Sequence, residues 1–486
     1  MLARAVTHAL VGLEARPVEV EAHLQRGVPA FAIVGLPDKA CQEAKERVRS
    51  GIASAELEWP LRRITVNLAP AGLRKEGSGF DLPIALAVLA ASHQVPPEAL
   101  ARHAAIGELA LDGRLRPVPG VLVAAEAAKR AGLDRLICPA ESAAEASLAG
   151  VEPVPVRHLA EAGSYLRGKF TPDPVAGSLP SRRNGGIPDL ADVRGQERAR
   201  RALEIAAAGR HNLLFGGPPG TGKTMLARRL PGVLPPLSHA EALEVTRIHS
   251  VAGLLPAGHG VVDLPPFRAP HHTASAPAII GGGSPPRPGE VTLAHHGVLL
   301  LDELAEFARP ALEALRQPLE DGSVAIARTT GRLLFPARLV LVGTMNLCPC
   351  GARGDPGLEC ACSPQRLSAY REKVSRALID RFDLVVSVPR ARSREYGAPG
   401  ERSERVRGRV VQARERLSAS PPPLSEPAAA LLGRAVDTLP LSGRGRARVT
   451  RVARTVAALA GAEGVEAEHV AEALAYRTPS ELGAAA

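Results

Sequence analysis

The stretch Gly217-Pro218-Pro219-Gly220-Thr221-Gly222-Lys223-Thr224 matches the phosphate-binding pattern G-x-x-x-x-G-K-[ST] at every fixed position. Residues 211–215 before it are typical of a short buried strand, and residues 225–230 after it are typical of a helix. In such a turn the glycines let backbone N–H groups approach a triphosphate, Lys223 adds a positive charge, and the Thr224 hydroxyl reaches Mg²⁺. The stretch therefore predicts a parallel α/β sheet that binds ATP and Mg²⁺.

Two apolar strands further along the chain end in polar residues suited to the same site. Residues 297–301 run into Asp302 and Glu303, and residues 339–345 run into Asn346. Because doubly wound sheets bind ligands at the carboxyl ends of their strands, we expect Asp302 to hold Mg²⁺ and Glu303 to polarise the attacking water. Asn346 is expected to orient that water; its alternative is a turn-capping asparagine.

An arginine between acids precedes a further apolar strand, at Asp380-Arg381-Phe382-Asp383. Phosphoryl transfer often recruits such an arginine from a neighbouring subunit, so Arg381 is a candidate finger acting in trans. The alternative is a local salt bridge to Asp380 or Asp383.

The composition is that of a globular protein with several cores. The chain has 486 residues, of which 45% are hydrophobic and 23% charged, and its net charge is +10. The positive charge favours nucleic acid as a partner, although an arginine-rich genome composition could produce part of the bias. No segment approaches the ~20 apolar residues of a membrane span or resembles a signal peptide, so we expect a cytoplasmic protein with no membrane partner.

Composition and periodicity divide the chain into four parts. Residues 1–170 alternate strand and helix patterns, as an α/β or α+β domain does. Residues 171–187 are rich in Pro, Gly, Ser and Arg and indicate a linker. Residues 188–392 contain the nucleotide motifs, and residues 393–486 are expected to be helical, with helices at 425–438, 446–461 and 467–476.

Four of the six cysteines fall within fifteen residues, as two C-x-C pairs. Four soft thiolates this close, with glycines between them, suit a structural Zn²⁺. Metal-free thiols or a redox pair are the alternatives. The proposed ligands are Cys348, Cys350, Cys360 and Cys362, whereas Cys41 and Cys138 stand in apolar surroundings typical of core residues.

Long motifs outside the phosphate loop resemble the AAA+ ATPases, in the branch of the Mg-chelatase motors and MCM helicases, and most closely the ComM/YifB-type Mg-chelatase-like family. They are residues 33–38, 66–70, 267–275, 281–283 and 288–295. The resemblance implies an AAA+ core with a helical lid, and a homo-hexameric ring that acts on DNA as a helicase or branch-migration motor during natural transformation. It implies that Arg381 is the finger and that Arg444 is a second sensor, with Arg446 and Arg448 as alternatives.

Residues 323–338 have the pattern of a hairpin around Thr329-Thr330-Gly331. In related rings the hairpin before the first sensor lines the pore, so Arg328 and Arg332 are expected to contact DNA phosphates without reading sequence. The alternative is that these arginines lie on a solvent-exposed strand edge, where their charge prevents aggregation.

The first domain resembles the Lon-protease-like fold. Its pattern places Gly79 where the protease has its serine and Leu122 where it has its lysine, and Ser78 has no obvious lysine partner. A nucleophile needs a positioned base, so a role in ring assembly or DNA binding is expected rather than proteolysis. The rival functions are a chelatase motor that remodels a metal-insertion complex and an ATP-dependent protease.

Overall fold

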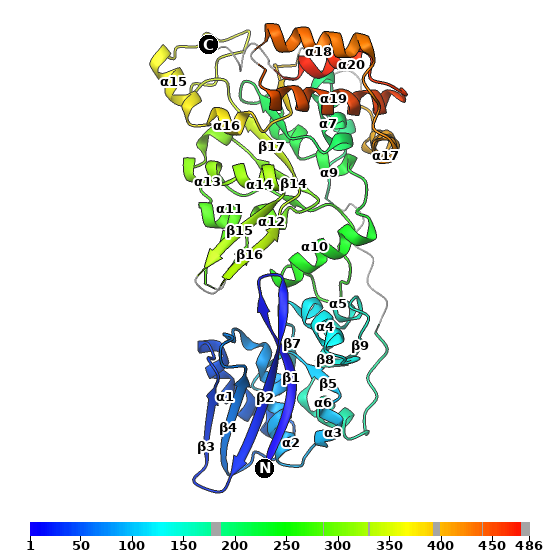
Figure 1. Ribbon diagram of the computed structural model, residues 1–486. Coiled ribbons are helices and arrows are strands. Elements are labelled where there is room, and N and C mark those ends of the chain that lie inside the picture. The colour runs from blue at the N-terminus through cyan, green and yellow to red at the C-terminus, as the bar shows by residue number, and fades with distance from the viewer. Residues whose placement is uncertain (176–185, 285, 329–330, 392–398, 440, 478–486) are drawn as a thin grey trace. The chain divides into compact units, whose positions relative to one another are not determined.

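The computed structural model describes residues 1–175, 186–284, 286–328, 331–391, 399–439 and 441–477 (Figure 1). The chain forms two compact units. The N-terminal unit comprises Met1–Ser181, His239–Asp263 and Pro285–Arg287; the C-terminal unit comprises Arg182–Ser238, Leu264–Ser284 and Pro288–Ala486. The expected nucleotide-binding stretch of 188–392 is thus interrupted, because its segment His239–Asp263 groups with the N-terminal unit.

The N-terminal unit is built on a seven-stranded mixed sheet of order β3-β4-β2-β1-β5-β8-β9. The strands are β1 (Leu2–Val11), β2 (Glu14–Gln25), β3 (Ala30–Val34), β4 (Arg63–Ala69), β5 (His103–Ala105), β8 (Arg135–Pro139) and β9 (Glu152–Val156). Strand β2 is antiparallel to β1 and β4, and the other pairs are parallel. Alternate residues of β2 from Val18 to Leu24 are buried, as expected of a strand with one face on a core.

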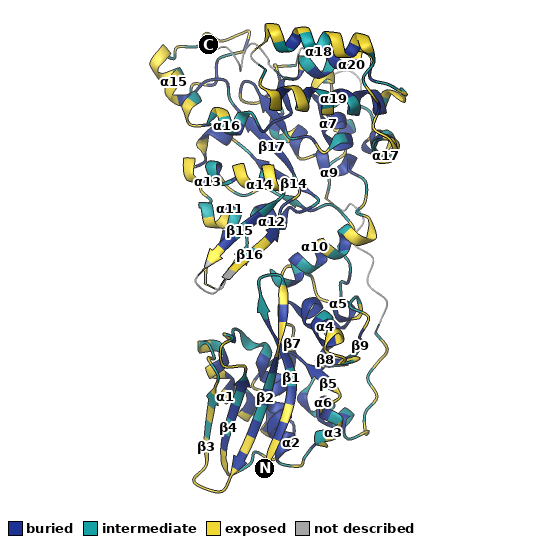
Figure 2. Ribbon diagram, in the orientation of Figure 1, coloured by how far each residue is buried: buried dark blue, intermediate teal, exposed yellow. Residues whose placement is uncertain are grey.

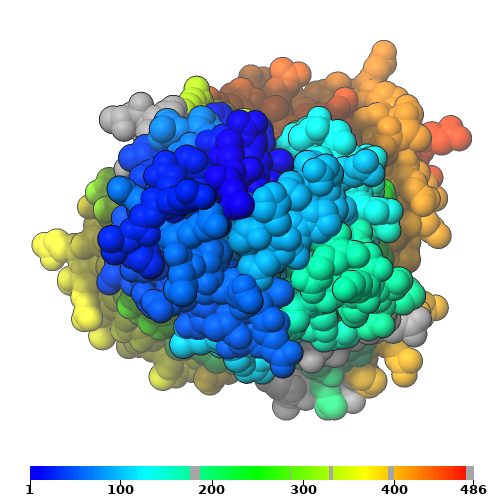
Figure 3. Space-filling model, turned by 90° about the horizontal axis from the view of Figure 1, so that it is seen from below, coloured from blue at the N-terminus to red at the C-terminus, as the bar shows by residue number. Residues whose placement is uncertain are grey.

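Helices cover this sheet. They are α1 (Lys39–Ser54), α2 (Asp81–Ala91), α3 (Pro97–Leu100), α4 (Val121–Arg130), α5 (Ala143–Ser147), α6 (Leu159–Leu166) and α10 (His239–Val251), and a small ladder joins β6 (Glu108–Leu109) to β7 (Leu115–Arg116). Every residue of α2 is buried, and its Asp81 is paired with Arg47 at 2.6 Å. Figure 3 shows the surface of this unit, on which blue atoms from its first half adjoin cyan atoms from its second half.

The segment His239–Asp263, which belongs to the N-terminal unit, is joined to α4 by several polar contacts. Arg247 on α10 pairs with Glu126 at 2.7 Å. The Ser250 carbonyl accepts the Gly120 N–H, and the Ser250 hydroxyl donates to the buried Glu145, which also accepts the N–H of Leu122. Helix α10 therefore belongs structurally to the N-terminal unit, although it lies between nucleotide motifs in the sequence.

The C-terminal unit contains a five-stranded parallel sheet of order β11-β14-β17-β10-β18. The strands are β11 (Phe267–Arg268), β14 (Val298–Leu301), β17 (Val340–Met345), β10 (Leu213–Gly216) and β18 (Leu384–Ser387). The three central strands β14, β17 and β10 are buried along their whole length, which explains why they read as continuous apolar runs. Figure 2 shows two of them, β14 and β17, in the dark blue of buried residues. The predicted α/β fold is confirmed.

Helices and a hairpin surround this sheet. The helices are α7 (Glu197–Gly209), α8 (Lys223–Ala227), α9 (Leu230–Val233), α11 (Ala276–Ile280), α12 (Glu290–Leu293), α13 (Arg309–Ala314), α14 (Arg316–Asp321), α15 (Pro364–Glu372) and α16 (Arg376–Ile379). The hairpin is β15 (Ser323–Arg328) with β16 (Gly331–Pro336), and β12 (Gly281–Gly282) and β13 (Arg287–Pro288) are two-residue strands.

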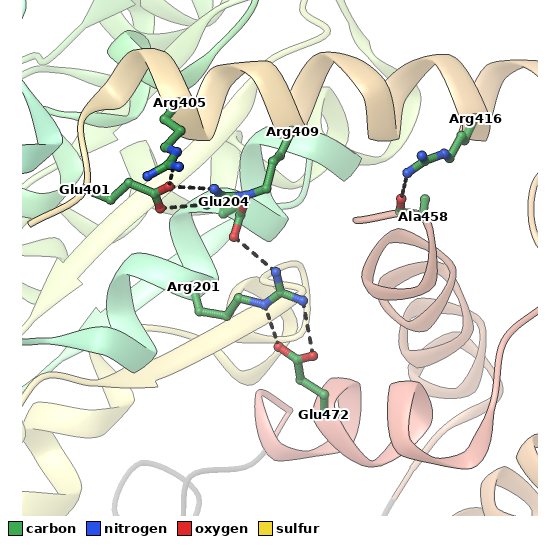
Figure 4. A network of polar contacts seen from close by, with 8 residues as sticks. All are labelled: Arg201, Glu204, Glu401, Arg405, Arg409, Arg416, Ala458 and Glu472. Carbon is green, nitrogen blue, oxygen red and sulfur yellow. Dashed lines mark hydrogen bonds and ion pairs between the residues drawn. The ribbon is translucent and has the colours of Figure 1, made fainter. Parts of the chain in front are cut away.

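The helical C-terminal region is also confirmed. It consists of α17 (Ser403–Ala419), α18 (Glu426–Thr438), α19 (Gly443–Ala460) and α20 (Ala467–Ala475). Figure 4 shows how α17 and α20 are joined to α7: Arg409 bridges Glu204 and Glu401, and Arg201 pairs with Glu472 at 3.0 Å. These helices therefore contact the five-stranded sheet through α7. Among the described residues, no helix has both the length and the apolar character needed to cross a bilayer.

Candidate nucleotide site

The phosphate loop connects β10 to α8, as its sequence predicts. Gly220 and Gly222 have φ of 75° and 88°, a left-handed backbone that favours glycine. At Gly217 a Cβ would lie 2.3 Å from the carbonyl oxygen of Val388, so the backbone directly after β18 leaves no room for a side chain. The glycines of the motif are therefore needed for the conformation and packing of the turn, in addition to letting backbone N–H groups approach a phosphate.

Lys223 lies inside this loop and is largely buried. Its Nζ donates to the carbonyl oxygens of Gly217 at 2.8 Å and Pro218 at 2.7 Å, and to Asn346 Oδ1 at 3.1 Å. Burial lowers the pKa of Lys223, while the nearby Asp302 and Glu303 raise it. The ammonium is therefore placed between the loop and the end of β17, where it can exchange carbonyl partners for phosphate oxygens.

The acid that follows β14 meets the hydroxyl that follows the loop. Thr224 Oγ1 donates to Asp302 Oδ1 at 2.8 Å, and Thr344 Oγ1 donates to the same oxygen at 2.6 Å. Thr344 in turn accepts the N–H of Glu303 at 2.9 Å. A hydroxyl beside a carboxylate is the donor set that Mg²⁺–ATP sites use, so Thr224 and Asp302 fit that ion.

Thr344 is a residue that the sequence reasoning missed. It orients Asp302 and at the same time fixes the backbone of Glu303, whose φ of 57° is unusual for a residue with a side chain. Its position near the end of β17, two residues before Asn346, is the signal that could have revealed it.

The four clustered cysteines come together directly after Asn346. The Cys348 and Cys350 sulfurs are 3.3 Å apart, those of Cys350 and Cys360 are 3.7 Å apart, and all four sulfurs including Cys362 lie within 4.8 Å of one another. Tetrahedral Zn²⁺ holds its sulfurs about 3.8 Å apart, so the group fits this ion. The N–H of Ala352 and the neighbouring thiols lower the pKa of Cys350 to about 6, which favours the thiolate form that binds metal. Cys41 and Cys138 are buried, as expected.

This cysteine loop packs against the phosphate loop. A Cβ on Gly351 would lie 3.0 Å from the ring of Pro219, and a Cβ on Gly354 would lie 2.9 Å from Leu347. The two glycines therefore permit close contact between the cysteine loop and its surroundings, including the prolines of the phosphate motif.

The two predicted sensor and finger arginines lie together, away from the phosphate loop. Arg381 Nη2 is 2.5 Å from Glu320 Oε2, and Arg444 Nη2 is 2.9 Å from Glu320 Oε1. Both line a cavity of about 440 Å³, and its described lining contains none of residues 217–224. Of the alternatives to Arg444, Arg448 lines the same cavity and donates to the Asp380 carbonyl, whereas Arg446 is exposed.

The alternative interpretation of Arg381, a local salt bridge to Asp380 or Asp383, is wrong. Asp380 instead pairs with Arg477, and Asp383 pairs with Arg451 at 2.7 Å. Arg381 points to Glu320, a residue sixty-one positions earlier in the chain, because α14 brings that carboxylate to the cavity.

The predicted hairpin is formed by β15 and β16, which pair antiparallel from Ser323 opposite Pro336 to Arg328 opposite Gly331. Val324, Ile326 and Phe335 are buried, whereas Arg332 is exposed and Leu334 is 62% exposed. The side chain of Arg328 and the whole of Thr329 and Thr330 lie outside the described residues.

In the N-terminal unit, the positions at which the Lon-protease pattern has its serine and lysine carry no groups suited to proteolysis. Leu122 is buried, and a Cβ on Gly79 would meet only the apolar side chains of Ile106 and Val118. The Ser78 hydroxyl donates to Glu108. No hydrogen bond joins Ser78 to a lysine within the described residues, and the Lon mechanism requires a lysine as the base.

Comparison with known proteins matches three families along the chain. "Magnesium chelatase, subunit ChlI" covers residues 189–396, "Subunit ChlI of Mg-chelatase" covers 20–142, and "Magnesium chelatase, subunit ChlI C-terminal" covers 419–477. Competence protein ComM of Haemophilus influenzae is 42% identical over 98% of this chain and 97% of its own, and YifB of Escherichia coli is 41% identical over the same shares. The magnesium-chelatase 38 kDa subunit of Rhodobacter capsulatus is 28% identical over 57% of this chain and 82% of its own.

Proposed function

The chain belongs to the ComM/YifB-type family of Mg-chelatase-like AAA+ proteins, and on this basis we propose that it is an ATP-driven DNA motor. The observation that carries the proposal is the convergence of Lys223, Thr224, Asp302 and Asn346 at one edge of the parallel sheet. ATP would supply the phosphoryl group there; Lys223 would neutralise its charge, Thr224 and Asp302 would hold Mg²⁺, and Glu303 would polarise the attacking water.

The site is completed by a second copy of the chain. Arg381 and Arg444 line a cavity whose described lining contains none of residues 217–224, which supports a role for them at the nucleotide of a neighbouring copy. A head-to-tail contact repeated around a closed ring brings each arginine cavity to the next nucleotide. We propose a homo-hexamer in which Arg381 is the finger and Arg444 the second sensor.

The partner that we propose is single-stranded or branched DNA. The net charge of +10, the exposed Arg332 on β16 and the name of the competence relative support this choice. Arg328 and Arg332 would hold phosphates in the ring channel, so that hydrolysis moves the hairpin along DNA during recombination in natural transformation. A Zn²⁺ on the four cysteines would brace the loop beside the nucleotide.

The experiment is the ATPase rate of the full chain with and without single-stranded or forked DNA, at low and high salt. DNA is expected to raise the wild-type ATPase rate, and high salt is expected to remove this stimulation because it weakens binding to the phosphates. The variant Glu303→Gln is expected to bind ATP and DNA but not to hydrolyse ATP, because the attacking water loses its activating carboxylate.

The second candidate is a chelatase motor that remodels a metal-insertion complex. The similarity to the Rhodobacter subunit, which extends over 57% of this chain, favours it. This candidate predicts that DNA neither binds the chain nor raises its ATPase rate at low salt. If that result is obtained, the chelatase motor becomes the preferred function.

A further inference from the structure

One carboxylate holds both of the candidate trans arginines. Glu320 is on the last turn of α14, and its two oxygens are divided between Arg381 at 2.5 Å and Arg444 at 2.9 Å. Arg381 comes from the turn before β18, and Arg444 comes from the first turn of α19. Glu320 therefore ties a part of the nucleotide-binding core to a part of the helical lid.

Arg381 is incompletely satisfied in this arrangement. The residue is only 7% exposed; its Nη1 donates to the Ala377 carbonyl and its Nη2 to Glu320. Its buried Nε has no hydrogen-bond partner among the described residues. A buried guanidinium with an unused donor is costly, and an incoming anion with several oxygens would satisfy it better than the single oxygen of Glu320 does.

The charge of the cavity also favours an anion. It is lined by the arginines at positions 210, 338, 381, 444, 448 and 451, and by only two carboxylates, Glu320 and Asp383. Asp383 is 3% exposed and accepts from Arg451 and the Asn212 N–H, so it is fixed in place. The Glu320 side chain is 45% exposed and is the carboxylate of this lining that can swing away into solvent.

We propose that Glu320 is a positioning residue that holds Arg381 and Arg444 as a pair until the triphosphate of a second copy replaces its carboxylate. The inference rests on the proposed function, in which these arginines serve the neighbour's nucleotide. Assembly then exchanges one anion for another: the two guanidinium groups leave Glu320 and bind phosphate oxygens. The competing ion pairs weaken ring formation until ATP is bound.

The test is ATP-dependent assembly of Glu320→Gln, measured by light scattering against protein concentration with Mg²⁺ and ATP, together with the ATPase rate. The amide keeps the shape of the side chain and removes the charge, so half-maximal assembly is expected at about fivefold lower protein concentration, the effect of losing a partly exposed ion pair. Asp321→Asn is the matched control, because it removes the same charge from the next, exposed residue of α14; it is expected to behave as wild type.

The outcomes separate this inference from the proposed function. If Arg381→Ala retains the wild-type ATPase rate at all protein concentrations, the shared site is wrong. If Arg381→Ala is inactive but Glu320→Gln assembles at the wild-type concentration or a higher one, the shared site stands and the role of Glu320 is overturned. Glu320→Ala provides a second neutral variant, whose folding is checked by thermal unfolding, and the same shift is expected of it.

Discussion

Replacing Thr344 by valine tests how the proposed magnesium ligand Asp302 is held in position. Valine has the shape of threonine and fits the buried strand β17, but it lacks the hydroxyl that donates to Asp302 at 2.6 Å and accepts from the Glu303 N–H at 2.9 Å. The substitution leaves one buried donor unpaired and removes one hydrogen bond to a carboxylate. Each loss costs about 1–3 kcal/mol, so we expect the two together to lower the free energy of unfolding of the C-terminal unit by at least about 2 kcal/mol.

The substitution is also expected to weaken binding of the ion. Residues that orient a metal ligand typically contribute about 10–100-fold to metal affinity, so the Mg²⁺ concentration for half-maximal ATPase rate is expected to rise by at least about tenfold. The assays are a magnesium titration of the ATPase rate and urea unfolding of the same preparation.

Thr292→Val is the matched control. Thr292 is fully buried, and its hydroxyl has no partner within the described part of the chain. Removing this hydroxyl is expected to leave the free energy of unfolding unchanged or to raise it, with no change in the magnesium requirement. The reasoning is refuted if Thr344→Val keeps the wild-type magnesium dependence, or if the two variants have equal stability.

Three further predictions concern the phosphate loop, the cysteines and acid stability. Gly217→Ala is expected to weaken nucleotide binding at least about tenfold, because its Cβ would lie 2.3 Å from the Val388 oxygen and displace the loop; unchanged affinity for a fluorescent ATP analogue would contradict this. Cys350→Ser is expected to lower bound zinc from about one per chain to below about 0.3, while Cys138→Ser, a buried cysteine of the other unit, leaves it unchanged; equal zinc in both would exclude the four-thiolate site. Burial raises the pKa of Asp383, but His211, Arg451 and the Asn212 N–H outweigh it and lower the pKa from 3.8 to about 2. This contribution, about 2 kcal/mol, is present above pH 4 and is lost as the pH falls towards 2, so Asp383→Asn should flatten the acid limb of a stability–pH curve.

Much of the fold and half of the candidate site could be predicted from the sequence. The phosphate loop, the strand before Asp302 and the strand before Asn346 are continuous in sequence, and local pattern is sufficient where a strand runs directly into a functional residue. The same holds for the last three C-terminal helices, whose apolar periodicity marks them within three residues of their observed bounds, whereas α17 was not predicted as a separate helix.

The rest depends on contacts between distant residues. Glu320 meets Arg381 across sixty-one positions, and Thr344 meets Asp302 across forty-two; neither pair leaves a local pattern. The segment His239–Asp263, which contains α10, belongs to the N-terminal unit, and its ties to α4, such as the pair of Arg247 with Glu126, show where it packs.

The most direct measurement of the shared site is the ATPase rate of a mixture of two inactive variants. Glu303→Gln lacks the activating carboxylate, and Arg381→Ala lacks the finger, so each variant alone is expected to be inactive. In rings formed from an equal mixture, about a quarter of the interfaces combine an intact Glu303 with an intact Arg381 from the neighbour, and about a quarter of the wild-type rate should return. If the mixture is no more active than either variant alone, the two residues do not act across one interface and the account is contradicted.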